Sequence, residues 1–131
     1  MQNAKKLRVY GVAEDLAVLV YELTRQFPIE ERFGLAQQMR RAAVSVGSNI
    51  AEGSGRDGNA ELLRFLRIAL GSATELEFQL GLARRMRLAA ADATSEALAS
   101  CISVQRMLTR LIITIRPTPD ASRGRPKTEK P

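Results

Sequence analysis

Residues 40–56 read RRAAVSVGSNIAEGSGR, a stretch of small and polar residues that starts with two arginines and ends in glycines. In and just before it, small and apolar residues recur at alternating spacings of three and four, which predicts an α-helix over residues 35–53. Its apolar face consists of Ala36, Met39, Ala43, Val46, Ile50 and Gly53. Its polar face consists of Arg41, Ser45, Ser48, Glu52 and Arg56. Because the apolar face is built largely from small side chains, a neighbouring helix can approach it closely, and the helix is predicted to contact partners on two sides.

Apolar periodicity predicts three further helices. The first covers residues 12–26 and ends before Pro28, with an apolar face of Val12, Leu16, Leu19, Leu23 and Phe27. The longest helix is capped by Asn59 and carries a coiled-coil-like seam at alternating spacings of four and three. That seam consists of Leu62, Leu66, Ala69, Ala73, Leu76, Leu80 and Ala83. The last helix covers residues 90–115, and residues 29–34 connect the first helix to the second.

Four amphipathic helices with short connections predict one domain over residues 1–116, an all-α, antiparallel up-down-up-down four-helix bundle. The composition agrees with this fold class, because aromatic residues make up only 5% of the chain and helix-favouring residues dominate. Residues 117–131 read PTPDASRGRPKTEKP, with four prolines and no large apolar residue. We therefore predict a disordered basic tail there, which serves either as a solubilising end or as a nucleic-acid arm.

Two segments carry a resemblance to a known family. Residues 27–56 read FPIEERFGLAQQMRRAAVSVGSNIAEGSGR, and residues 61–85 read ELLRFLRIALGSATELEFQLGLARR. Over residues 7–116 the chain resembles the four-helix bundle family of the 23S rRNA intervening-sequence protein (S23-like), which is related to the accessory variability proteins of diversity-generating retroelements. Gly47 departs from that pattern, since the family usually has proline there. The resemblance implies a barrel-like homopentamer with a basic surface that contacts RNA or DNA, and a reverse transcriptase as a further partner.

The chain lacks the residue types that most enzyme and metal sites require. It contains no histidine and one cysteine, Cys101, which removes histidine-dependent catalysis and makes zinc binding implausible. Residues 53–58 match G-x-G-x-x-G, but a dinucleotide site requires a preceding strand and none is predicted. We therefore expect no enzyme activity, no cofactor and no metal. Cys101 stands among apolar residues and is predicted to be buried and unreactive.

Polar side chains on the second and third helices form two matching stripes. They are Ser45, Ser48, Asn49 and Glu52 on the second helix, and Ser72, Glu75 and Gln79 on the third. One interpretation is a polar binding site between the helices; the other is an interhelical or intersubunit hydrogen-bond network that fixes their register. We favour the network, because a buried carboxylate without partners is costly. On that interpretation, replacing Glu52 with alanine destabilises the assembly.

The net charge of +6 and the pI of about 10.2 favour an anionic partner. Two function classes stay open: an oligomeric nucleic-acid-binding protein without catalytic activity, and a structural or protein-interaction module whose charge is incidental. The candidate phosphate contacts are Arg40, Arg41, Arg56, Arg64, Arg67, Arg84, Arg85 and Arg87. Arg64 with Arg67, and Arg84 with Arg87, are three residues apart, so each pair is predicted to share a helix face. Almost no aromatic residue is expected at the surface, so binding is predicted to depend on charge or shape rather than on base stacking.

Two further expectations concern location and assembly. No signal peptide is visible and no apolar run approaches the length of a bilayer span, so we expect a cytoplasmic protein without a membrane partner. The third helix is apolar around more of its circumference than a monomeric bundle needs, which predicts an oligomer.

Overall fold

The computed structural model of the chain describes residues 2–115, so the predicted tail at 117–131 lies outside the described residues. Within that range the backbone forms four α-helices, one short 3₁₀ turn and no strand, which confirms the all-α class. The elements in chain order are α1 (Gln2–Thr24), η1 (Ile29–Glu31), α2 (Leu35–Ser54), α3 (Asn59–Met86) and α4 (Ala91–Thr114).

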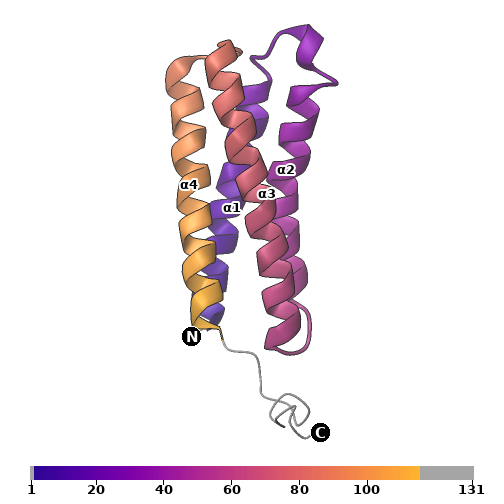
Figure 1. Ribbon diagram of the computed structural model, residues 1–131, viewed down its shortest axis with the longest axis vertical. Coiled ribbons are helices and arrows are strands. Elements are labelled where there is room, and N and C mark those ends of the chain that lie inside the picture. The colour runs from indigo at the N-terminus through magenta and orange to yellow at the C-terminus, as the bar shows by residue number, and fades with distance from the viewer. Residues whose placement is uncertain (1, 116–131) are drawn as a thin grey trace, which may run out of the picture.

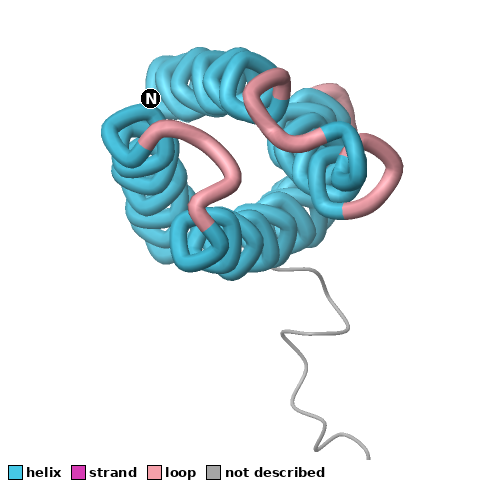
Figure 2. The backbone as a smooth tube through the Cα atoms, turned by 90° about the horizontal axis from the view of Figure 1, so that it is seen from above, coloured by secondary structure: helices cyan, strands magenta, loops and turns pink. Residues whose placement is uncertain are grey.

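The four helices lie side by side around one common core. Helix α1 packs against α2 and α4, and α3 packs against the same two helices. In Figure 1 the α1–α2 connector and the α3–α4 turn lie at one end of the molecule, and the α2–α3 loop lies at the other. Seen from above, the helices enclose a centre (Figure 2) that the buried side chains of all four fill.

The apolar seam predicted for α3 is the centre of this core. Every member of the seam is buried, and the members from Leu66 to Ala83 have no exposed surface. The neighbouring α4 contributes Cys101, Val104 and Leu108, which are also fully buried. The alternating spacing of four and three therefore identified the core face of the longest helix correctly.

The prediction for the first helix was wrong in its start and partly correct in its buried face, since Leu16, Leu23 and Phe27 are buried as predicted. The helix begins at Gln2 rather than near residue 12. The core positions of α1 are Val9, Ala13, Leu16, Val20 and Leu23, whereas Val12 and Leu19 are only partly buried. Val12 and Leu19 are apolar and still pack against the core although they are only partly buried, so the apolar residues of α1 cover more than one face and their spacing did not separate the buried positions from the partly buried ones.

The loop between α2 and α3 differs in one detail from expectation. Asn59 is the first residue of α3, and the N-cap position belongs to Gly58. Gly58 has a φ of +85°, which lies in the left-handed region that favours glycine. Just before the loop, Gly53 is buried against α3, and a Cβ atom at Gly53 would lie 2.8 Å from the Cβ of Phe65.

Helix α4 contains an 18-residue window that is long and apolar enough, by length and composition alone, to cross a bilayer. The expectation that no apolar run approaches this length was therefore wrong for α4. A core helix of a soluble bundle meets the same criterion. One third of that window is buried inside the bundle.

The lone cysteine is packed inside the bundle, as its apolar neighbours predicted. Cys101 is fully buried, and its Sγ donates to the backbone oxygen of Ala73 at 3.2 Å. Burial, together with the negative charge of Glu77, raises the pKa of the thiol to about 12, although a hydrogen bond from Gln105 acts in the opposite direction. The thiol therefore stays protonated at neutral pH, and the reactive thiolate form is scarce.

Candidate nucleic-acid interface

The eight candidate arginines lie in three groups along the bundle: on α2, around the α2–α3 loop, and at the end of α3. All of them are exposed except Arg40, which is partly buried. Among the side chains that the structure describes, those of residue 6 and residues 8–115, there are two salt bridges, formed by Arg56 and Arg64. The other exposed candidates have no carboxylate within salt-bridge distance in the described chain. They are Arg41, Arg67, Arg84, Arg85 and Arg87.

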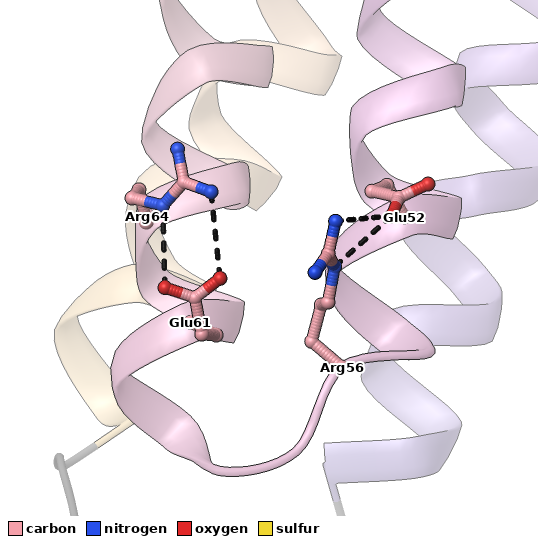
Figure 3. Close-up of polar contacts among 4 residues, drawn as sticks. All are labelled: Glu52, Arg56, Glu61 and Arg64. Carbon is pink, nitrogen blue, oxygen red and sulfur yellow. Dashed lines mark hydrogen bonds and ion pairs between the residues drawn. The ribbon is translucent and has the colours of Figure 1, made fainter.

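Arg56 and Arg64 each pair with a glutamate that lies within one turn of it along the chain (Figure 3), and both lie near the ring of Phe65. Arg56 Nη2 lies 2.8 Å from Glu52 Oε2, and Arg64 Nε lies 3.3 Å from Glu61 Oε2. Their guanidinium carbons lie 5.1 Å and 4.4 Å from the centroid of the Phe65 ring. Both arginines are therefore already partnered, and a phosphate would compete with a carboxylate for each of them.

Arg40 is held in place by the end of α1. Its Nε donates to Thr24 Oγ1 at 2.7 Å, and its guanidinium carbon lies 4.8 Å from the centroid of the Tyr21 ring. The Thr24 hydroxyl in turn donates to the backbone oxygen of Val20 at 2.7 Å. These bonds fix the orientation of the Arg40 guanidinium, whereas the adjacent Arg41 is exposed.

At the end of α3, Arg87 stands in an unusual backbone conformation. Its φ of 55° and ψ of 47° are left-handed, and no other non-glycine residue in the described chain has a positive φ. The Arg87 amide donates to Arg84 O, and the Leu88 amide donates to Ala83 O, both at 3.1 Å, which is a Schellman ending. Arg84 and Arg87 therefore do not share a continuous helix face, and that prediction was wrong because the helix ends between them.

The predicted polar stripes meet at one point between α2 and α3. Ser45 Oγ and Ser72 Oγ share a hydrogen bond of 2.8 Å across the two helices. Asn49 Nδ2 donates to Ser45 Oγ at 3.0 Å and to the Ser45 backbone oxygen at 2.8 Å. This serine-centred cluster of Ser45, Asn49 and Ser72 is the interhelical part of the network.

The other stripe members do not join that cluster. Ser48 is exposed, and Glu52 pairs with Arg56 one turn further along its own helix. Glu75 is exposed and accepts from Gln79 Nε2 at 3.4 Å within α3. Within one bundle Glu52 therefore lies outside the interhelical cluster, because the guanidinium at i+4 is within reach of its carboxylate. A contact of Glu52 across a subunit interface stays a prediction.

This geometry reverses the expectation for Glu52. Replacing Glu52 with alanine should change the free energy of unfolding by less than about 0.5 kcal/mol, because both partners of the ion pair are half exposed. Replacing Ser45 with alanine should cost about 1 kcal/mol, because it removes the shared hydroxyl between Ser72 and Asn49. Urea unfolding of both variants tests the difference. If Glu52→Ala lowers the free energy of unfolding more than Ser45→Ala does, the Glu52 carboxylate belongs to the network after all.

The sequence patterns missed two exposed phenylalanines. Phe33 is 81% exposed in the connector before α2, and Phe78 is 71% exposed on α3. The expectation of almost no surface aromatics was therefore wrong. The available signal for Phe33 was its place in a short non-periodic segment, where no helix face buries an apolar side chain.

Within the described residues, no group of three histidine, cysteine or carboxylate side chains is placed to hold a metal ion.

Comparison with known proteins agrees with this architecture. Residues 5–110 match the family model described as 23S rRNA-intervening sequence protein. A crystal structure of a protein with unknown function from the S23 ribosomal protein family of Bacteroides thetaiotaomicron VPI-5482 is similar, with a TM-score of 0.77 and 25% identity. The similarity covers 84% of this chain and 99% of that one. No curated protein matches the sequence. The chain thus belongs to the 23S rRNA-intervening sequence protein family.

Proposed function

We propose that this protein is a non-catalytic, oligomeric helical-bundle protein that binds nucleic acid through its arginine-rich surface. The observation that carries the proposal is that five of the eight candidate arginines are exposed and have no carboxylate partner in the described chain. Unpaired surface guanidinium groups are suited to bidentate phosphate contacts. No carboxylate has to be displaced from them before a phosphate binds.

The proposed assembly is a homopentamer of antiparallel up-down-up-down bundles. Its support is an apolar strip on the outside of α3, where Phe78, Leu82 and Met86 follow one another at one-turn spacing with 71%, 38% and 51% exposure. Exposed apolar side chains in a row are typical of an interface between proteins. Light scattering should give five times the 14.4 kDa of one chain, and a stable monomer at micromolar concentration would refute the assembly.

The proposed partners are RNA or DNA, and the protein acts in the cytoplasm without a membrane. RNA is supported by the name of the family, which refers to an intervening sequence of 23S rRNA. The support for an accessory role to a reverse transcriptase is the resemblance of the sequence to the accessory variability proteins of diversity-generating retroelements. The competing class is a protein-interaction module, which the same apolar strip on α3 would serve.

Arg87 offers a test in which stability and binding change in opposite directions. Replacing Arg87 with glycine removes a candidate phosphate contact and should weaken binding of short RNA and DNA at low salt severalfold. The same change should raise the free energy of unfolding by up to about 1 kcal/mol, because glycine adopts the left-handed conformation without strain. Fluorescence anisotropy and urea unfolding measure the two effects.

Arg87→Lys is the matched control, because it keeps the charge and the strained backbone. It should bind nearly as the wild type does. If the wild-type oligomer binds neither RNA nor DNA at low salt, the interaction-module function replaces the nucleic-acid function. If Arg87→Gly binds unchanged, the end of α3 is not part of the interface.

A further inference from the structure

An open pocket of about 640 Å³ lies where the end of α1 and the connector meet the first turns of α2. Its lining includes Arg32, Arg40 and Arg41, together with the rings of Tyr21 and Phe33. A second pocket of about 320 Å³ adjoins it, because Arg32 and Arg40 line both. The two pockets thus lie next to each other with that pair of arginines between them, and they are together called the depression.

This depression is lined by positive charge without a compensating carboxylate. Arg25 lines the second pocket, so four guanidinium groups border the two pockets, and no aspartate or glutamate lines either. Glu31, the residue before Arg32, lines neither pocket, and its Oε1 accepts the Leu35 amide at 3.3 Å at the start of α2. The depression therefore selects an anionic ligand.

Phe33 adds an aromatic surface to this basic pocket. Phe33 is 81% exposed, the largest exposed fraction among the large apolar residues of the described chain. The guanidinium carbon of Arg32 lies 5.9 Å from the ring centroid, and Val44 lines the same pocket with 45% exposure. Aromatic rings beside a basic groove are the combination with which proteins hold single-stranded nucleic acids, because each base has a face that stacks.

Arg40 is already oriented at the boundary between the two pockets. Its bond to Thr24 Oγ1 uses Nε, and Tyr21 covers one face of its guanidinium. The two terminal nitrogens are not engaged by that bond, so they are available for a bidentate contact. A side chain that is fixed before binding loses little conformational freedom when a phosphate arrives.

From this geometry we infer that the pocket holds an unpaired nucleotide of single-stranded RNA or DNA. The base stacks on Phe33, and the flanking phosphates contact Arg40 and Arg41. The volume lies within the range of about 300–1,000 Å³ typical of ligand pockets. A base inside a duplex is already stacked on its neighbours and does not reach the ring. The inference rests on the proposed nucleic-acid function and specifies its substrate, single strands in preference to duplexes.

The test compares how variants of Phe33 bind single strands and how they bind a duplex. The full-length protein is titrated against short mixed-sequence single-stranded RNA, single-stranded DNA and the matching DNA duplex. Phe33→Leu keeps an apolar side chain but no stacking surface, and it should weaken single-strand binding by about tenfold or more while duplex binding stays unchanged. Phe33→Trp should retain single-strand binding. Tyr10→Leu, at an exposed aromatic residue that lies outside both the pocket and the apolar strip on α3, should have no such effect.

The possible outcomes separate this inference from the proposed function. If the wild type binds nucleic acid but Phe33→Leu leaves single-strand binding unchanged, or weakens duplex binding equally, the pocket inference is overturned and the proposed function stands. If the wild type binds no nucleic acid at low salt, both fail. Two further results overturn the inference. If Phe33→Leu changes the oligomeric mass, the pocket is a subunit interface. If polyglutamate also binds, and Phe33→Leu weakens that binding as much as it weakens single-strand binding, the pocket is a site for acidic protein.

Discussion

The affinity of the wild-type protein for RNA or DNA should fall by about three orders of magnitude between 50 and 200 mM salt, if six or more phosphates are contacted. Each phosphate contact releases condensed counterions from the nucleic acid, so the logarithm of the binding constant falls linearly with the logarithm of the salt concentration. An oligomer repeats every arginine group, so weak contacts on several subunits act together. Anisotropy titrations at a series of salt concentrations give the slope.

Charge-removing variants of paired and unpaired arginines provide the internal control. Arg84→Gln with Arg85→Gln removes two exposed cations without carboxylate partners, and the slope should become shallower by about one for each phosphate that the variant no longer neutralises. Arg56→Gln should change the slope less, because its guanidinium is already paired with Glu52 at 2.8 Å. Equal slopes for the wild type and both variants would show that these arginines make no phosphate contacts.

The fold was largely predictable, because the buried positions of a helical bundle recur at a regular spacing along each helix. The α3 seam from Leu62 to Ala83 recurs at alternating spacings of four and three, and every member is buried. The pattern was weaker in α1, where the core face includes Ala13 between Val9 and Leu16. Val12 and Leu19 are also apolar and only partly buried, so residue spacing in α1 did not show which of two adjacent apolar faces lies in the core.

The candidate site was less predictable, because it depends on contacts between elements and on backbone conformation. Glu52 was placed in a network by its spacing from Ser45 and Ser48, but the competing partner Arg56 follows at i+4. The left-handed conformation of Arg87 occurs at a helix end where glycine is the usual residue. The pocket beside Phe33 forms only when α1, the connector and α2 are assembled. Residue spacing within one helix carries no information about such an arrangement.

Replacing Gly53 with alanine should lower the free energy of unfolding by about 1–3 kcal/mol. The new Cβ would lie 2.8 Å from Phe65 Cβ and 3.3 Å from Leu62 Cδ1. The nearer atom is attached directly to the α3 backbone, so it moves only if α2 and α3 separate. Gly53 is therefore the residue that sets the distance between these helices near their loop. Urea unfolding followed by circular dichroism measures the loss.

The same substitution at Gly47, in the same helix, should have the opposite sign. A Cβ there would lie 4.0 Å from Ala13 Cβ, which is ordinary van der Waals contact, and alanine in a helix interior is favoured over glycine by about 0.5–1 kcal/mol. Opposite signs for Gly53→Ala and Gly47→Ala would separate close helix approach from helix propensity. If Gly53→Ala is as stable as Gly47→Ala, the α2–α3 spacing is not set at Gly53. The packing of Phe65, between Arg56 and Arg64, would then have to adjust without cost.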